Sequence, residues 1–86
     1  MDEIIVGDLL TIKEERYIVL ELLEYNGDKY SFVNKISNDD NATEDFYILK
    51  ILEKNVSFVV DDNLKNILLP SFQKMLKKDL EKILVE

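Results

Sequence analysis

The fold is decided by residues 16–36, which read RYIVLELLEYNGDKYSFVNKI. Asn26 and Gly27 suit the positive φ angles of a type I′ turn, and aromatic strand-forming residues flank the pair on both sides. Residues 16–25 therefore predict a long strand, and residues 29–36 predict its antiparallel return.

Apolar side chains occupy both faces of the first strand. Successive side chains of a strand point to opposite faces, so one face is expected to carry Ile18, Leu20 and Leu22. The other face is then expected to carry Tyr17, Val19, Leu23 and Tyr25, interrupted by Glu21. Residues of this kind on both faces indicate a central strand that is covered at least in part on each side.

Further strands are expected on either side of this hairpin. Residues 9–12, 45–52 and 56–60 form short apolar runs bounded by turn residues. Residues 37–44, SNDDNATE, are too polar for a strand and predict an exposed loop. Because every connection is short, neighbouring strands are expected to pair as an antiparallel meander.

The hydrophobic period changes to that of a helix after Asp61. Asp61, Asp62 and Asn63 are each suited to cap a helix. A stripe at i+4 spacing follows, widened by Ile67, Met75 and Ile83, and consists of Leu64, Leu68, Phe72, Leu76, Leu80 and Leu84. Pro70 predicts a short helix ending near Leu68 or Leu69 and a longer one from Pro70, with a single kinked helix as the alternative.

These elements predict a single α+β domain over residues 1–86. Residues 1–60 form an antiparallel four- to five-stranded β-meander, either a twisted sheet or a partly closed barrel. Residues 61–86 form one or two C-terminal helices packed on one face of the sheet. That face is expected to include Ile18, Leu20, Phe32 and Ile48.

Composition argues against catalysis. The chain has no histidine and no cysteine, and its formal net charge is −7. Residues 1–62 hold 15 acidic against 6 basic residues, whereas residues 63–86 hold 3 against 5. No serine has a histidine to activate it and no phosphate-binding glycine motif is present. We therefore expect no enzyme, no catalytic or metal residues and no cofactor.

The expected cellular compartment and the disfavoured classes of partner follow from the sequence and its charge. The acidic start Met1-Asp2-Glu3 is unlike a signal peptide, and the absence of cysteine is compatible with a reducing compartment, so a cytoplasmic protein is expected. No apolar run approaches the ~20 residues that span a bilayer. A pI near 4.5 disfavours direct binding to nucleic acid or to an anionic membrane and favours a basic partner.

An acidic loop offers a possible calcium site. From Asp39 onward, oxygen ligands alternate as in an EF-hand. However, Glu44 stands at the sixth position, where the turn needs glycine, and Lys50 stands at the twelfth, where a bidentate glutamate belongs. A solvated loop is the better interpretation.

The candidate binding residues combine acids with tyrosines. The four tyrosines all lie in predicted strands, where a structural role as cross-strand partners is favoured over a role as interface anchors. Tyr25 and Tyr30 flank the hairpin turn and are the pair most expected to be exposed. The acids would form one surface only if loop and strand ends converge. The predicted partner-binding set is Glu24, Tyr25, Asp28, Tyr30, Asp39, Asp40, Glu44 and Asp45.

Three segments carry a family resemblance: residues 24–30 (EYNGDKY), 45–50 (DFYILK) and 59–62 (VVDD), the last leading into a helix with Phe72. In this order they resemble a family of short acidic proteins of unassigned function from Gram-positive bacteria. Residues 6–17 are similar to proteins of phages and other mobile elements. The resemblance implies the architecture above and no catalytic residues.

Two functions are compatible with these observations. The first is a small non-enzymatic protein-binding module, an inhibitor or regulator that occupies a partner's basic surface. The alternative is a nucleic-acid mimic that blocks the basic groove of a protein such as a bacterial immune nuclease, in the manner of an anti-CRISPR protein. A regulator that binds a small ligand or metal is a third class, and a homodimer is possible if sheet and helix leave apolar surface exposed.

Overall fold

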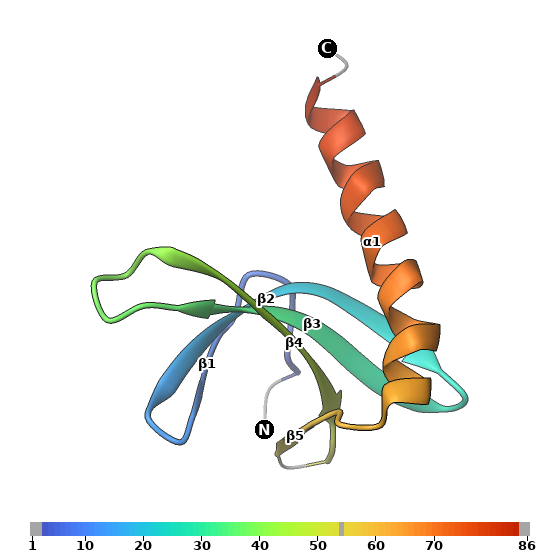
Figure 1. Ribbon diagram of the computed structural model, residues 1–86, viewed down its shortest axis with the longest axis horizontal. Helices are drawn as coiled ribbons and strands as arrows, with labels where there is room; N and C mark the ends of the chain where they lie inside the picture. The colour runs from blue at the N-terminus through green and yellow to red at the C-terminus, as the bar shows by residue number, and fades with distance from the viewer. Residues whose placement is uncertain (1–2, 54, 85–86) are drawn as a thin grey trace.

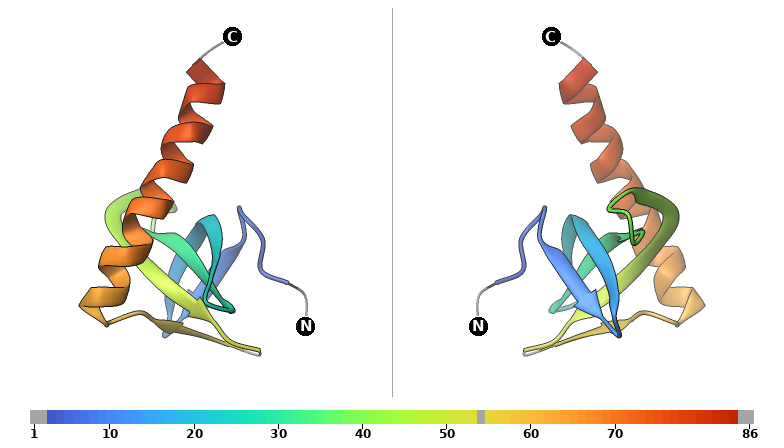
Figure 2. Two further views of the ribbon diagram at one scale, coloured as in Figure 1. Left: turned by 90° about the vertical axis from the view of Figure 1, so that its right-hand side faces the viewer. Right: turned by 90° about the vertical axis from the view of Figure 1, so that its left-hand side faces the viewer.

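The computed structural model describes residues 3–53 and 55–84, with side chains through Lys78. Five strands form one antiparallel sheet in the order β1-β2-β3-β4-β5, and one helix follows. Their bounds are β1 Leu9–Ile12, β2 Glu15–Tyr25, β3 Asp28–Ile36, β4 Ala42–Ile51, β5 Val56–Phe58 and α1 Asp62–Leu84. The sheet curls into a half-barrel, and α1 packs on its outer side (Figures 1 and 2). The predicted α+β fold is confirmed.

Two tight hairpins set the register of the first three strands. Asn26 and Gly27 have φ angles of 51° and 82°, as the type I′ turn requires. Lys13 and Glu14, with φ angles of 50° and 69°, form a second two-residue turn of the same hand between β1 and β2. The long central pairing of β2 with β3 is therefore fixed by the predicted turn.

A bulge in β2 reverses the predicted faces of its second half. The register with β3 shifts between Val19 and Glu21. Because a shift by one residue moves every later side chain to the other face, Leu22 does not share a face with Leu20. Leu22 packs instead with Val19, and the assignment of Leu23 to the same face as Val19 is wrong for the same reason.

The sheet separates two apolar clusters. The helix-side core lies between the sheet and α1 and consists of Tyr30, Phe32, Ile48, Val59, Leu68 and Phe72. The inner core lies on the other side of the sheet, within the curl of the half-barrel, and consists of Tyr17, Val19, Val33 and Leu49. Leu20, Phe32 and Ile48 contribute to the helix-side core as predicted, whereas Ile18 lies outside it and is half-buried.

The C-terminal segment is one helix, so the prediction of a break at Pro70 is wrong. Pro70 lies inside α1 and is exposed. Its neighbours Leu68 and Phe72 are fully buried, and this packing offsets the backbone hydrogen bond that proline cannot make.

The start of α1 is capped as predicted. The Asp61 carboxylate accepts hydrogen bonds from the backbone N–H groups of Asn63 and Leu64, at 2.9 and 3.3 Å. The buried apolar stripe of α1 is narrower than predicted, because Ile67 is 48% exposed. Leu64, Leu68, Phe72 and Leu76 pack as expected. The predicted contacts of Leu80, Ile83 and Leu84 lie outside the described side chains. The last turns of α1 extend beyond the sheet (Figure 2).

Candidate partner-binding surface

The predicted binding residues divide between opposite ends of the sheet. Glu24 and Asp28 lie beside the β2–β3 turn, whereas Asp39 and Asp40 lie in the β3–β4 loop. The nine residues of β3 separate these ends by about 26 Å. Figure 1 shows the cyan turn and the green loop projecting in opposite directions. The loop and strand ends do not converge, so the acids do not form one surface.

The expectation that Tyr25 and Tyr30 form an exposed pair is wrong. Tyr30 is only 4% exposed and belongs to the helix-side core, while Tyr25 is half-buried and packs against the same core. The bulge in β2 and the face alternation of β3 turn both rings toward α1. The two tyrosines therefore hold the helix on the sheet.

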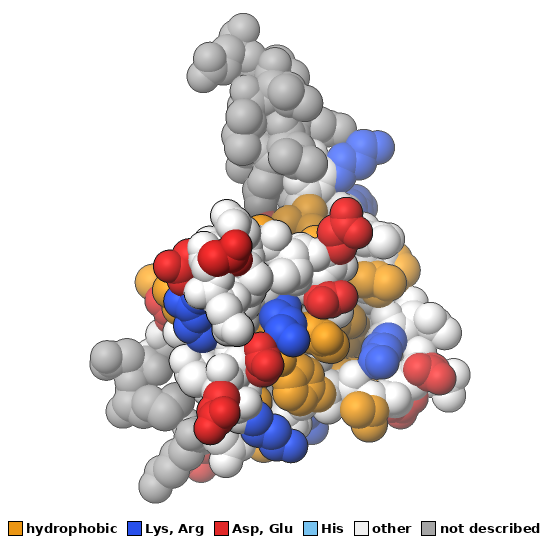
Figure 3. All heavy atoms as spheres, turned by 60° about the vertical axis from the view of Figure 1, so that its left-hand side comes forward, with side chains coloured by type: hydrophobic (Ala, Val, Ile, Leu, Met, Phe, Trp, Pro, Cys, Tyr) orange, Lys and Arg blue, Asp and Glu red, His pale blue; other side chains and the backbone are white. Residues whose placement is uncertain are grey.

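Basic side chains neutralise part of the acidic set. The Arg16 guanidinium pairs with Asp40 and donates a further hydrogen bond to the Ser37 carbonyl at 3.0 Å. Lys50 Nζ lies 3.5 Å from an Asp28 oxygen. On the face that Figure 3 presents, acidic and basic side chains alternate with apolar ones. The described side chains on that face form no continuous acidic patch.

The β3–β4 loop is organised by its own hydrogen bonds. The Ser37 hydroxyl donates to Asp39 and accepts from the Asn41 N–H at 3.2 Å. The bond from Ser37 lowers the pKa of the Asp39 carboxyl below its ordinary value. Within the described part of the chain, no group of three or more potential metal-binding side chains comes together.

The beginning of β4 is shaped by a second bulge. The register with β3 shifts between Asn34 and Ile36, and β4 starts at Ala42 rather than at the predicted Asp45. The buried Asn34 amide donates to the carbonyls of Thr43 and Asp45, at 2.8 and 3.0 Å. The Thr43 hydroxyl donates to the Lys35 carbonyl at 2.8 Å. Side chains therefore replace the ladder bonds that the bulge removes.

An apolar groove lies between β4, the β5–α1 connection and the first half of α1. Its volume is about 800 Å³, and its walls include Lys65, Leu69 and Gln73. We call it the aromatic groove, and its defining residues are Tyr17, Phe32, Phe46, Tyr47, Phe58 and Val60. Phe46, Tyr47 and Val60 are 50%, 38% and 80% exposed. This is a size and composition at which proteins bind ligands or peptide side chains.

Ring-to-ring contacts hold the aromatic groove in place. Tyr17, Tyr47 and Phe58 meet edge to face, with centroids 5.5–5.8 Å apart. Phe46 stacks on Phe32, and Phe32 stacks on Phe72 of α1. Burial raises the pKa of the Tyr17 phenol above its ordinary value. The groove is therefore a preformed surface.

Sequence reasoning missed this groove. Phe46 and Tyr47 are neighbours on β4, and neighbouring side chains of a strand point to opposite faces, so the pair does not stand out as one site. They meet in one groove because β5 is only three residues long and exposes both sides of β4. The available signal was two adjacent aromatics directly after two acids, Glu44 and Asp45.

The edge of β4 is open beside the groove. β5 pairs with Leu49–Ile51, and the Val59 N–H then donates to the Ile48 carbonyl at 2.9 Å. Val60 and Asp61 lead away into α1. Among the described residues, the part of β4 before Ile48 pairs with β3 alone.

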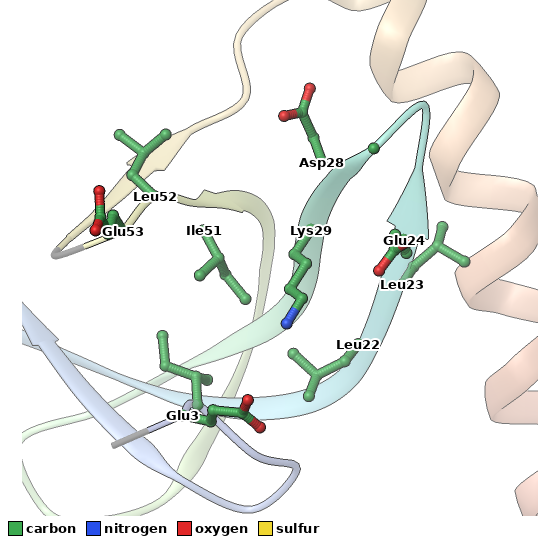
Figure 4. Close-up of a pocket in the computed structure, with 11 residues that line it drawn as sticks. Glu3, Leu22, Leu23, Glu24, Asp28, Lys29, Ile51, Leu52 and Glu53 are labelled. Carbon is green, nitrogen blue, oxygen red and sulfur yellow. The ribbon is translucent and has the colours of Figure 1, made fainter. Parts of the chain in front are cut away.

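A second cavity of about 540 Å³ lies near the β2–β3 turn and the end of β4. Figure 4 shows the Lys29 side chain extending into it between Leu22 and Ile51, with Glu3, Glu24 and Glu53 around it. Among the described residues that line this cavity, acids surround Lys29, which leaves no clear ligand chemistry.

Comparison with known proteins adds no further assignment. No protein-family model, curated protein or solved structure matches the chain. No helix in the described part of the chain is long and apolar enough to cross a membrane. The family resemblance remains a prediction.

Proposed function

We propose that this chain is a non-enzymatic protein-binding module, an inhibitor or regulator that acts by occupying the surface of a partner protein in the cytoplasm. The observation that carries the proposal is the aromatic groove. Phe46, Tyr47 and Val60 remain exposed around a preformed apolar cavity, although the chain has an apolar core on each side of its sheet.

Several properties of the aromatic groove favour a protein as the partner. Aromatic residues dominate binding energy at protein interfaces when they lie in well-packed surroundings, as Phe46 and Tyr47 do here. Glu44 and Asp45 are exposed and directly precede the groove residue Phe46 in β4, so a basic partner surface suits this part of the chain. Of the predicted binding residues, these two therefore keep a direct place in the proposal.

Nucleic-acid mimicry has less support. A mimic needs a dense array of acids on one rigid surface. In this chain Asp28 and Asp40 lie at opposite ends of the sheet, and each has a basic partner. The predicted similarity to proteins of mobile elements favours a host protein as the target of either role.

Affinity capture from the organism that encodes the chain tests the proposal. Val60→Asp places a charge in the aromatic groove at an 80% exposed position, and Ile67→Asp is the matched control on an exposed part of α1 outside the groove. A retained protein that is lost with Val60→Asp and kept with Ile67→Asp supports the proposal. Equal retention by both variants would contradict it.

A salt series on the retained protein separates the two functions. Binding through the aromatic groove is expected to change little as salt rises, because apolar contacts are not screened. Mimicry predicts a steep loss with salt, and a joint loss on changing Asp39→Asn, Asp40→Asn and Glu44→Gln.

A further inference from the structure

The open edge of β4 offers backbone groups in a definite pattern. In an antiparallel ladder, alternate residues direct both N–H and C=O toward the same neighbouring strand. Ile48 accepts from Val59 on the β5 side, so Phe46, two residues earlier, directs its N–H and C=O to the same side. At Phe46, no strand among the described residues pairs with β4 on this side. An unpaired edge of this kind is a template for an added strand.

Charge decides what can pair with this edge. Glu44 and Asp45 are exposed and directly precede Phe46, and Asp61 and Asp62 are exposed and directly follow Val60 in the chain. Lys65 is the one basic side chain that lines the groove within the described residues. The four acids that flank groove residues in the chain, which we call the rim, complement a cationic segment.

A second copy of the chain is the less suitable occupant. The middle of the open part of β4, residues 42–47, is occupied by Glu44 and Asp45. Residues directly opposite each other in an antiparallel pair direct their backbone groups alike, so the two-fold axis between two copies passes through one residue. An axis at Glu44 or at Asp45 would place that acid directly opposite itself, which destabilises a strand pair. The acids thus protect the edge from self-association.

We propose that the β4 edge binds an extended cationic segment of the partner protein as an additional antiparallel strand, with apolar side chains entering the aromatic groove. The inference rests on the proposed function and specifies its mode. Antiparallel pairing places the segment's residues opposite Tyr47, Phe46, Asp45 and Glu44 in turn. The favoured order, from N- to C-terminus, is therefore two apolar residues followed by two basic ones.

A designed peptide of about six residues, a usual strand length, tests this mode. The probe is acetyl-Thr-Val-Phe-Lys-Lys-Thr-amide, titrated to millimolar concentration into the ¹⁵N-labelled full chain. The expected result is a shift of the Phe46 and Tyr47 amide signals, with slower hydrogen exchange at the Phe46 N–H. An unshifted Phe46 signal at millimolar probe overturns the inference.

N-methylated probes separate strand addition from simple insertion of side chains. The probe's phenylalanine lies opposite Phe46 and exchanges both hydrogen bonds with it, whereas the next lysine directs its N–H away from β4. Methylation of the phenylalanine amide is expected to abolish the shift, and methylation of that lysine amide to leave it. Equal binding of the two methylated probes overturns strand addition.

Charge variants test the rim. Glu44→Gln and Asp45→Asn should each weaken probe binding by about two- to fivefold, the range of an exposed ion pair. Asp39→Asn, in the β3–β4 loop and outside the residues paired with the probe, is the matched control and should leave binding unchanged. A probe with glutamates in place of both lysines should not bind, and binding of that probe overturns the charge argument.

Two outcomes distinguish this inference from the proposed function. A native partner that is lost with Val60→Asp while the probe fails to shift Phe46 leaves the proposed function standing and overturns strand addition. Concentration-dependent protection of the Phe46 N–H without any peptide would instead identify a second copy at the edge, and would overturn the cationic occupant.

Discussion

Phe46 stacks on Phe32, with ring centroids 5.5 Å apart and planes only 4° from parallel, while half of the Phe46 side chain stays exposed. Phe32 in turn stacks on Phe72 of α1 at 5.4 Å. These contacts continue from the aromatic groove into the helix-side core. The ring offered to a partner therefore rests on the packing between sheet and helix, and its position does not depend on a partner.

The Phe46–Phe32 contact gives the first prediction. Phe46→Ala should lower the free energy of unfolding by about 1–2 kcal/mol, since it removes an aromatic pair and the buried half of the ring. Val60→Ala, in the same groove but 80% exposed, should stay within about 0.5 kcal/mol. Urea denaturation measures both changes. Equal free energies of unfolding for the two variants would show that the stacking of Phe46 on Phe32 does not stabilise the fold.

The parts of the fold that sequence could predict are those with local causes. Asn26-Gly27 fixes its own turn through φ preference, and Asp61 caps α1 through bonds to residues two and three positions away. The spacing of Leu64, Leu68 and Phe72 places these side chains on one helical face.

The parts that escaped prediction depend on distant partners. The bulge at Val19/Glu21 changes the faces of Leu22 and Tyr25, but no local signal in β2 marks it. The aromatic groove exists because β5 ends at Phe58, which sequence periodicity did not indicate. The prediction that the acids form one surface was wrong because the length of β3 separates the β2–β3 turn from the β3–β4 loop.

Asn34 gives the second prediction, because its buried amide serves two carbonyls at the β4 bulge. Asn34→Ala leaves the Thr43 and Asp45 carbonyls without this donor and should cost about 2–3 kcal/mol of unfolding free energy. Asn34→Asp keeps the shape of the side chain but places a carboxylate against two carbonyl oxygens. Burial and this repulsion should raise the folded-state pKa of the introduced carboxyl above its unfolded value of about 4.

The sign of the pH effect follows from that raised pKa. Below about pH 4 the introduced carboxyl is protonated in both states and can donate a hydrogen bond, so the variant is closest to the parent chain. Its relative stability should fall as pH rises from the unfolded to the folded pKa. Urea melts of both chains across this range measure the difference. A pH-independent difference would show that the Asn34 side chain is not held against these carbonyls.

The third prediction concerns Ser37 and Asp39 in the β3–β4 loop. The Ser37 hydroxyl donates to the Asp39 carboxylate and lowers its pKa. Ser37→Ala should therefore raise the pKa of Asp39 toward its ordinary value. The stabilising effect of this bond is present above the unfolded pKa and is lost as pH falls through the lowered one. A ¹³C NMR titration of the carboxyl group measures the change, and Ser57→Ala, on β5, should leave it unaffected.

Ser31 gives the fourth prediction. It is fully buried, and its hydroxyl has no hydrogen-bond partner among the described residues. A buried hydroxyl without a partner costs about 1–3 kcal/mol, so Ser31→Ala should raise the free energy of unfolding by about 1 kcal/mol after the loss of packing atoms. The exposed Ser57→Ala is the control, with a change within about 0.5 kcal/mol. A destabilised Ser31→Ala would reveal a partner for the hydroxyl.

Pro70 gives the fifth prediction, because it lies inside α1 without terminating it. Proline costs about 3 kcal/mol relative to alanine in a helix interior, through the missing N–H and the clash with the carbonyl four residues earlier, that of Asn66. Pro70 is exposed, so alanine removes little packing and Pro70→Ala should raise the free energy of unfolding by about 1–3 kcal/mol. Ser71→Ala, at the next exposed position, changes helix propensity alone and should gain about 0.5 kcal/mol. Urea denaturation measures both, and a gain for Pro70→Ala no larger than that of Ser71→Ala would mean that α1 has already adapted its backbone to the proline ring.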